Sequence, residues 1–231
     1  MIKSLINFTL RPLGFEISNK YHQVLESKYG WRQYRVVKPD GSFDYSAYKE
    51  IQTGKNKRDI SQWQVDERNI EFLSKYLLGH LPQRPKFGLC HGTKRGLEQA
   101  WFKKYLECSV LGTEISDTAA DFPDQIQWDF HDIKPEWLNA ADFIYSNALD
   151  HSFDPEKAIN AWTQCLRPGG FLFVEWHYLG DFVNLTDPFN CDILQLTYAI
   201  TRWGKGAYCV REVIPTITNP DYLAFVVVYK F

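Results

Sequence analysis

Two histidines in this sequence follow runs of apolar residues that are predicted to be strands. His151 comes directly after Asp150, and His177 comes at the end of the next such run. An imidazole with an ordinary pKa of about 6.5 can remove a proton from a hydroxyl group near neutral pH. A base in this role accelerates a reaction by about 10²–10⁴-fold. We therefore predict that His151 is a general base, with His177 and Asp150 as the alternatives.

A glycine-containing turn lies upstream of these histidines. It spans residues 90–96, with glycines at Gly92 and Gly96, and Glu114 stands at the tip of the next predicted strand. Such a turn lets the backbone approach a ligand and opens a helix whose N-terminus favours negative charge. An acid about 20 residues further on accepts hydrogen bonds from ribose hydroxyls in nucleotide sites. The pair indicates a cofactor that contains a nucleoside.

The elements that must position these residues alternate between strand and helix from Pro85 onward. One helix is predicted to start at Pro155. Asp154 would be its N-cap, Pro155 its first residue and Glu156 the acid of its first turn. Residues 167–170, Arg-Pro-Gly-Gly, end that helix. Strands are expected at 86–90, 109–113, 126–128, 141–146, 171–175, 207–215 and 222–230, and further helices at 96–107, 116–121 and 190–202.

This alternation implies right-handed crossovers and a three-layer α/β architecture. The last two strands follow each other through Asn219-Pro220 and should therefore be antiparallel. Residues 224–229 are too apolar for a half-exposed edge, which favours a central strand. We predict a Rossmann-like, seven-stranded sheet, mostly parallel with an antiparallel C-terminal strand.

The chain is expected to divide into an N-terminal cap, residues 1–80, and a cofactor-binding domain, residues 81–231. The cap is predicted to be mainly helical or irregular, with its clearest helix over residues 64–79. Near the start, Ile2, Leu5 and Ile6 would share one helical face. We expect that face to pack onto the body of the protein rather than to lie on a membrane.

Residues 87–177 resemble the class I S-adenosylmethionine-dependent methyltransferases. Gly92 and Gly96 match the first and third glycines of that family's Gly-x-Gly-x-Gly turn. Lys94 replaces the second glycine, and Cys90 replaces the acid that precedes the turn. The most specific match is the fourth strand together with the segment after it, residues 142–170, which includes Asn-Ala-Leu-Asp-His, Asp-Pro and Arg-Pro-Gly-Gly.

The resemblance implies S-adenosyl-L-methionine as the cofactor. The glycine turn would hold the methionine carboxylate, with Lys94 or Arg95 as its partner. Glu114 would bind the ribose, and Asp129 would contact the adenine, with Asp132 as its rival. The residues implied at the cofactor are His91, Gly92, Thr93, Lys94, Gly96, Glu114, Ile115, Asp129, Phe130, Ser146, Asn147 and Ala148.

A basic segment upstream carries a second set of candidates, Lys55, Asn56, Lys57 and Arg58. Such residues can bind an anionic acceptor, for example a phosphorylated or nucleotide-linked sugar. The alternative is a solvated basic face. Trp176 would border the same pocket. Some bacterial methyltransferases of surface-polysaccharide synthesis look similar here, so we expect O-methylation of a small or sugar-derived acceptor in surface glycan or secondary metabolism.

Composition narrows the remaining classes. The formal net charge of -2 argues against a broad nucleic-acid footprint. Five cysteines without a CxxC pair suit a reducing, cytoplasmic compartment and predict buried thiols rather than a metal site. A catalytic divalent ion held by Asp150, Asp154 and His177 is the open alternative. No apolar run predicts stable membrane insertion, and the sequence indicates no oligomeric state.

Two other function classes compete with the methyltransferase. One is an NAD-dependent oxidoreductase on a dinucleotide-binding fold, which Cys90, Lys94 and the terminal antiparallel strands disfavour. The other is a non-catalytic binding protein that retains the fold, which the incomplete glycine turn favours. Binding of S-adenosylmethionine, of NAD or of neither would separate the three.

Overall fold

The computed structural model describes residues 21–27, 29–180 and 182–231. The predicted apolar face of Ile2, Leu5 and Ile6 lies outside the described residues. Within them, no helix combines the length and the apolar character needed to cross a bilayer. The described cysteines all carry free thiols, with Cys90, Cys165 and Cys191 buried and the other two partly buried.

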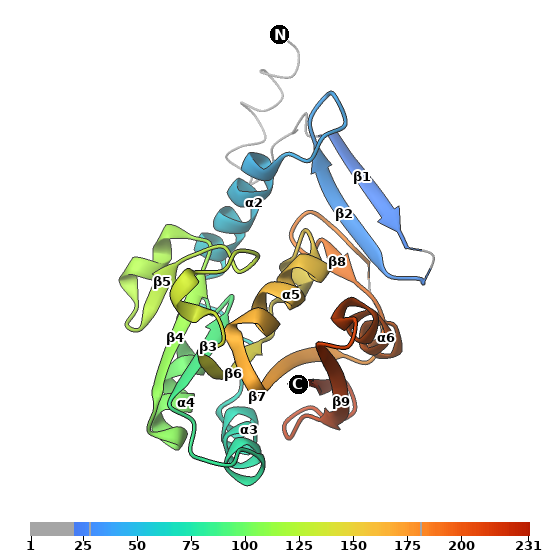
Figure 1. Ribbon diagram of the computed structural model, residues 1–231. Coiled ribbons are helices and arrows are strands. Elements are labelled where there is room, and N and C mark those ends of the chain that lie inside the picture. Colours follow the sequence, from blue (N-terminus) through green and yellow to red (C-terminus); the bar gives the residue numbers. More distant parts are fainter. Residues whose placement is uncertain (1–20, 28, 181) are drawn as a thin grey trace.

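A seven-stranded sheet forms the body of the protein, with strand order β5-β4-β3-β6-β7-β10-β9 (Figure 1). Its strands are β3 Phe87–His91, β4 Ser109–Glu114, β5 Gln125–Gln127, β6 Ala141–Ser146, β7 Leu166–His177, β9 Tyr208–Pro215 and β10 Leu223–Lys230. The five strands from β5 to β7 pair in parallel. β10 pairs antiparallel with both β7 and β9. The predicted sheet, including its antiparallel C-terminal strand, is confirmed.

β10 lies inside the sheet, as its composition predicts. Residues 224–228 are fully buried, because β7 and β9 flank the strand on both sides. β7 is longer than predicted and already begins at Leu166, so the Arg-Pro-Gly-Gly break belongs to a strand. Gly169 there has φ of +82°, a conformation that glycine adopts without strain.

The helices cover both faces of the sheet. α5 Pro155–Cys165 begins where predicted, with the Asp154 carboxylate accepting a hydrogen bond from the Lys157 amide. With α6 Ile193–Gly204 it forms one apolar core around Trp162 and Leu196. α3 Glu67–His80 and α4 Leu97–Leu106 form the other, around Leu73 and Phe102. The predicted helix near 116–121 is a 3₁₀ turn, η2 Asp117–Asp121.

The N-terminal part departs from the prediction of helical or irregular structure. β1 Tyr21–Glu26 and β2 Arg32–Val37 form an antiparallel pair, and β8 Phe189–Asn190 joins it from the body of the chain. Figure 1 shows this small sheet beyond one end of the larger one. Alternating burial in β2 is weak, which explains why periodicity did not reveal it.

Two helices of the first 80 residues lie in different parts of the fold. α2 Tyr45–Arg58 follows β2. α3 instead packs into the core of the large sheet through Ile70, Leu73 and Leu77. The division at residue 80 therefore separates α3 from elements with which it shares a hydrophobic core.

Candidate active site

A cavity of about 370 Å³ opens at the C-terminal ends of β3, β4 and β6, under α2. Most of the predicted site residues line it: Gly92, Thr93, Lys94, Glu114, Ile115, Asp129, Phe130, Asn147, Ala148, Asp150, His151, His177, Lys55 and Asn56. The others, His91, Gly96, Ser146, Lys57, Arg58 and Trp176, are not among its lining residues. A volume in this range suits a small-molecule or cofactor site.

The glycine turn supplies the cavity floor. Gly92 has φ of +74°, and a Cβ added there would lie 2.4 Å from the Ala148 Cβ, so only glycine fits. Lys94, in place of the family's second glycine, also adopts a left-handed conformation, with φ of +46°. Its ammonium donates to the Gln62 carbonyl at 3.2 Å, and Arg95 lies 5.8 Å from the Trp63 ring. The turn keeps the required backbone shape despite the substitution.

Glu114 ends β4 at the rim of this turn and is only 6% exposed. Its two carboxylate oxygens accept hydrogen bonds from the backbone amides of Lys94 and Ser116, each at 3.1 Å. Burial raises the pKa of Glu114, and these hydrogen bonds oppose that rise. Because a carboxylate oxygen can accept two hydrogen bonds, both oxygens retain capacity for a ligand hydroxyl.

Asp129 lines the cavity but already has several protein partners. Its oxygens accept hydrogen bonds from the Tyr45 hydroxyl at 2.7 Å and from the His131 amide at 2.9 Å. Burial alone would raise the pKa of Asp129, but contacts with His131 and Tyr45 lower it. Asp129 thus connects α2 to the sheet, and its contact with adenine stays a prediction. Its rival Asp132 pairs with Lys157 at 2.7 Å.

Two predicted residues lie behind the cavity wall and shape it. The Ser146 hydroxyl donates to the His91 carbonyl at 3.0 Å and accepts from the Ala148 amide at 3.1 Å. His91 stacks on Trp162, with its Nδ1 2.8 Å from the Thr113 hydroxyl, and burial lowers its pKa to about 3. Both residues therefore hold the turns that face the cavity rather than facing it themselves.

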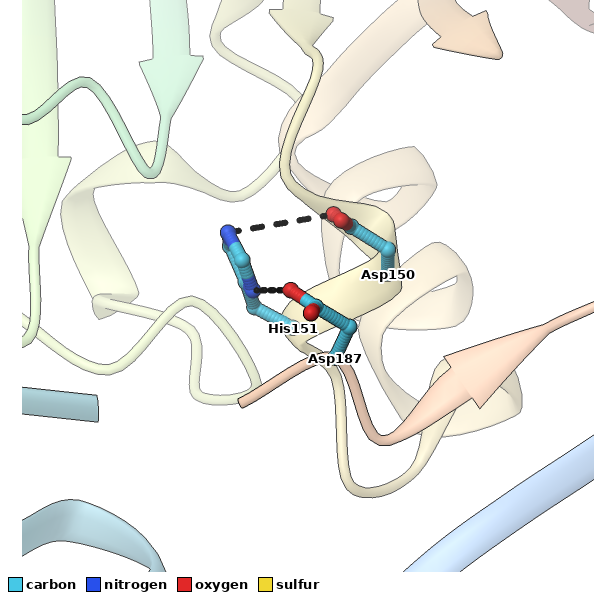
Figure 2. Close-up of side chains that lie close together, drawn as sticks. All are labelled: Asp150, His151 and Asp187. Atoms are coloured by element: carbon cyan, nitrogen blue, oxygen red, sulfur yellow. Dashed lines mark ion pairs between the residues drawn. The ribbon is translucent and has the colours of Figure 1, made fainter. Parts of the chain in front are cut away.

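His151 lines the cavity and lies between two carboxylates (Figure 2). It comes from η4 Leu149–His151 and is 30% exposed. Its Nδ1 is 2.8 Å from the Thr186 carbonyl oxygen and 3.3 Å from Asp187. A carbonyl only accepts, so Nδ1 carries the proton and Nε2, 4.0 Å from Asp150, is the basic nitrogen of the neutral ring.

The charges around His151 favour its protonated form. Burial alone would lower its pKa, but the Asp150 charge and the contacts with Asp187 and Thr186 raise it to about 9. In return, the hydrogen bond from His151 lowers the pKa of Asp187. Asp150, His151 and Asp187 also have ligand atoms within 4.8 Å of one another, a geometry compatible with a cation. Asp154 is instead the cap of α5, and neither it nor His177 belongs to that group.

The two candidates from the end of β7 are placed differently. His177 lines the cavity and its Nδ1 contacts the Leu179 carbonyl. Trp176 is 2% exposed and donates its indole N–H to the Cys191 carbonyl at 3.0 Å. The two rings stack, with their centroids 4.8 Å apart. Trp176 is thus a core residue that packs against the pocket-lining His177 and does not line the pocket itself.

The basic segment occupies the last turn of α2 and is split by the helix geometry. Lys55 lines the cavity with its ammonium 3.7 Å from Asp187, and Asn56 accepts a hydrogen bond from the Thr118 hydroxyl at 2.7 Å. Lys57 pairs with Asp117 at 2.7 Å, and Arg58 is exposed. The predicted cluster of four is therefore reduced to Lys55 and Asn56 at the cavity.

Sequence reasoning missed several lining residues. Asp187 and Glu98 are acids, while Tyr48 and Gln52 donate hydrogen bonds to the carbonyls of His151 and Thr186 at 2.9 and 3.1 Å. Glu98 sits one turn past the glycines, so its position in the first helical turn was a usable signal. Asp187 lies in a loop with no periodic pattern, and no local signal connects it to His151.

The residues present fit S-adenosylmethionine. Gly92 leaves room for close backbone approach, and Glu114 retains free acceptor capacity at a strand tip. Glu98, Glu114, Asp129, Asp150 and Asp187 place several carboxylates around the cavity, which suits a cofactor with a net positive charge.

Comparisons with known proteins agree with this geometry. Residues 89–174 match the family model described as a methyltransferase domain. A search of curated proteins found no match. Among solved structures, the Burkholderia thailandensis 1,6-didemethyltoxoflavin-N1-methyltransferase, with its substrate and S-adenosylhomocysteine bound, has a TM-score of 0.60 at 14% identity, covering 90% of this chain and 98% of that one.

Two further structures are similar in fold. The Streptomyces coelicolor geranyl diphosphate C-methyltransferase has a TM-score of 0.56 at 10% identity, covering 80% of this chain and 98% of that one. A mitomycin 7-O-methyltransferase has a TM-score of 0.54 at 11% identity, covering 71% and 54%. At such identities these likenesses establish the shared fold alone. Residues 89–174 thus match a methyltransferase domain, and the chain shares its fold with S-adenosylmethionine-dependent methyltransferases.

Proposed function

We propose that this enzyme methylates a hydroxyl oxygen of a small acceptor, with His151 as the general base. The observation that carries the proposal is the orientation of the His151 ring. Its Nδ1 faces the Thr186 carbonyl at 2.8 Å and Asp187 at 3.3 Å, which leaves Nε2 available to the cavity. The similar folds act on nitrogen, oxygen and carbon, so they do not select the acceptor atom.

The chemistry requires one proton acceptor. S-adenosylmethionine supplies a methyl group on a positively charged sulfur, and the departing product is neutral S-adenosylhomocysteine. As the acceptor oxygen bonds to the methyl carbon, its proton passes to Nε2 of His151. Asp187 and the Thr186 carbonyl hold Nδ1–H throughout, which fixes the ring and stabilises the imidazolium that forms.

The anionic character of the acceptor is the finer part of the proposal. Lys55 is the member of the basic segment that supports it, because its ammonium group belongs to a residue that lines the cavity. Asn56 lines the same wall. We propose a sugar-derived acceptor, including a phosphorylated or nucleotide-linked one, in surface glycan or secondary metabolism.

The test is methyl transfer from S-adenosylmethionine with a labelled methyl group to a panel of three acceptor classes: sugar phosphates, nucleoside-diphosphate sugars and uncharged phenols. We expect an O-methylated product with at least one class, and loss of transfer in His151→Ala with S-adenosylhomocysteine binding unchanged. Exclusive methylation of amines or carbon acids would contradict the proposal. Transfer abolished by a chelator and restored by Mg²⁺ would instead assign the Asp150, His151 and Asp187 group to a cation.

A further inference from the structure

Glu98 is a buried acid whose place in the protein is not explained by protein contacts. It lies in the first turn of α4, directly after the glycine turn, lines the cavity and is 5% exposed. Its Oε2 has no hydrogen-bond partner among the described residues. The backbone amide of Glu98 hydrogen-bonds its carboxyl group, but a buried oxygen that lacks a partner, as Oε2 does, is still costly.

The surroundings of Glu98 demand a positive charge. Burial raises its pKa to about 8, and the charges of Glu175 and Glu114 add to that effect. Burial likewise raises the pKa of Glu175 to about 7, although its carboxylate accepts the Tyr145 hydroxyl at 2.8 Å. Lys94 opposes the rise in the pKa of Glu98, but its ammonium donates to the Gln62 carbonyl. A cation bound in the cavity would stabilise the ionised form of Glu98.

The cofactor has one group that fits. The methionine portion of S-adenosylmethionine is an α-amino acid, so its ammonium is attached to the carbon that bears its carboxylate. A carboxylate held at the N-terminus of α4 brings that ammonium to the first turn of the helix. Glu98 is the acid of that turn.

The departure at Cys90 points the same way. Cys90 stands where the resemblance to class I methyltransferases implies an acid before the glycine turn, and it is fully buried. Burial raises the pKa of the Cys90 thiol, and the charge of Glu98 raises it further. Where β3 lacks an acid, the chain has Glu98 in the first turn of the following helix, α4, at the same cavity.

We propose that Glu98 binds the α-ammonium group of S-adenosylmethionine, a contact that replaces the acid missing at Cys90. The proposal rests on the cofactor and not on the acceptor atom, so it stands or fails separately from O-methylation. An ammonium–carboxylate hydrogen bond satisfies Oε2 and stabilises the ionised form of Glu98.

The test is calorimetric titration of Glu98→Gln with two ligands, S-adenosylhomocysteine and 5′-methylthioadenosine, which lacks the amino-acid portion. We expect the Kd of S-adenosylhomocysteine to rise about tenfold or more, with the Kd of 5′-methylthioadenosine unchanged within about twofold. Glu175→Gln is the matched control, because it alters a neighbouring buried acid that already has a partner, and should leave both Kd values nearly unchanged.

Two outcomes would overturn the proposal: unchanged affinity for S-adenosylhomocysteine, or equal weakening of both ligands. Thermal unfolding without ligand checks the fold of the variant. An acid whose pKa is higher in the folded than in the unfolded state destabilises the protein as pH rises above the unfolded value. Glu98→Gln should therefore have a higher Tm than wild type at pH 8 and an equal Tm at about pH 4. A Tm lowered at both pH values would show a structural role and contradict the proposal.

Discussion

The two sides of the cavity are built in different ways. The proposed cofactor side consists of the glycine turn, Glu114 and the first turn of α4, segments that follow one another along the chain. The proposed acceptor side brings together η4, the loop around Asp187 and α2. There, the Tyr48 hydroxyl reaches the His151 carbonyl from 103 residues away. One side is thus encoded by local spacing and the other by long-range packing, which allows them to be altered separately.

The largest effect is expected from His151→Ala. Removal of a general base should lower kcat by about 10²–10⁴-fold, while the Kd for S-adenosylhomocysteine stays unchanged because the ring lies on the acceptor side. Methyl-transfer kinetics measure this effect. His177→Ala is the matched control and should retain most of the turnover, since its Nδ1 contacts the Leu179 carbonyl rather than a carboxylate. A larger loss of turnover in His177→Ala than in His151→Ala would indicate that His177 is the general base.

The cofactor side should respond in the opposite way to Glu114→Ala. A hydrogen bond to a charged group contributes about 1.5–3 kcal/mol, which corresponds to about 10–100-fold in Kd. We expect S-adenosylhomocysteine affinity to fall by that factor, as measured by calorimetry. Asp117→Ala, three residues further in an exposed position, is the control and should bind normally. Wild-type affinity in Glu114→Ala would refute the predicted ribose contact.

The pH dependence tests the acceptor side alone. Since the pKa of His151 is raised to about 9, the neutral base is scarce at pH 7. We expect kcat/KM to rise about tenfold per pH unit up to that value. Asp187→Asn removes one of the contacts that raise the pKa, so the inflection should move to lower pH. An inflection at the same pH in Asp187→Asn and wild type would show that the group that titrates is not His151.

The smallest effect concerns acceptor charge. Lys55→Met should raise the KM for a sugar phosphate several-fold, because a partly buried cation at the cavity is lost, and the KM for an uncharged phenol should not change. Lys57→Met, on the outer face of the same helix turn, is the matched control. Equal KM values for the anionic acceptor in both variants would contradict the proposal that the acceptor is anionic.

The same contrast separates the features that could be predicted from the sequence from those that could not. The positions of the strands, the cap at Asp154 and the tips at Gly92 and Glu114 follow from periodicity and turn chemistry, which act over a few residues. Asp187 was missed because a loop position has no pattern, and it meets His151 only through the folded chain. Trp176 packs against His177 behind the cavity, and the sequence does not indicate which of these two neighbours lines it.

The N-terminal sheet shows the same limit. β2 pairs with β8, whose two residues come from far along the chain, so no local signal could announce that contact. Lys94 stands in place of a glycine yet keeps a left-handed backbone. From the sequence alone, this substitution argues against cofactor binding. Tertiary context thus overrides a local preference at that position.

The most direct test of the central claim is calorimetric titration of S-adenosylhomocysteine into wild type, Glu114→Ala and His151→Ala under identical conditions. We predict that His151→Ala binds S-adenosylhomocysteine with the Kd of wild type and that Glu114→Ala binds it at least about tenfold more weakly. Equal loss of binding in both variants would contradict the separation of a cofactor side from an acceptor side.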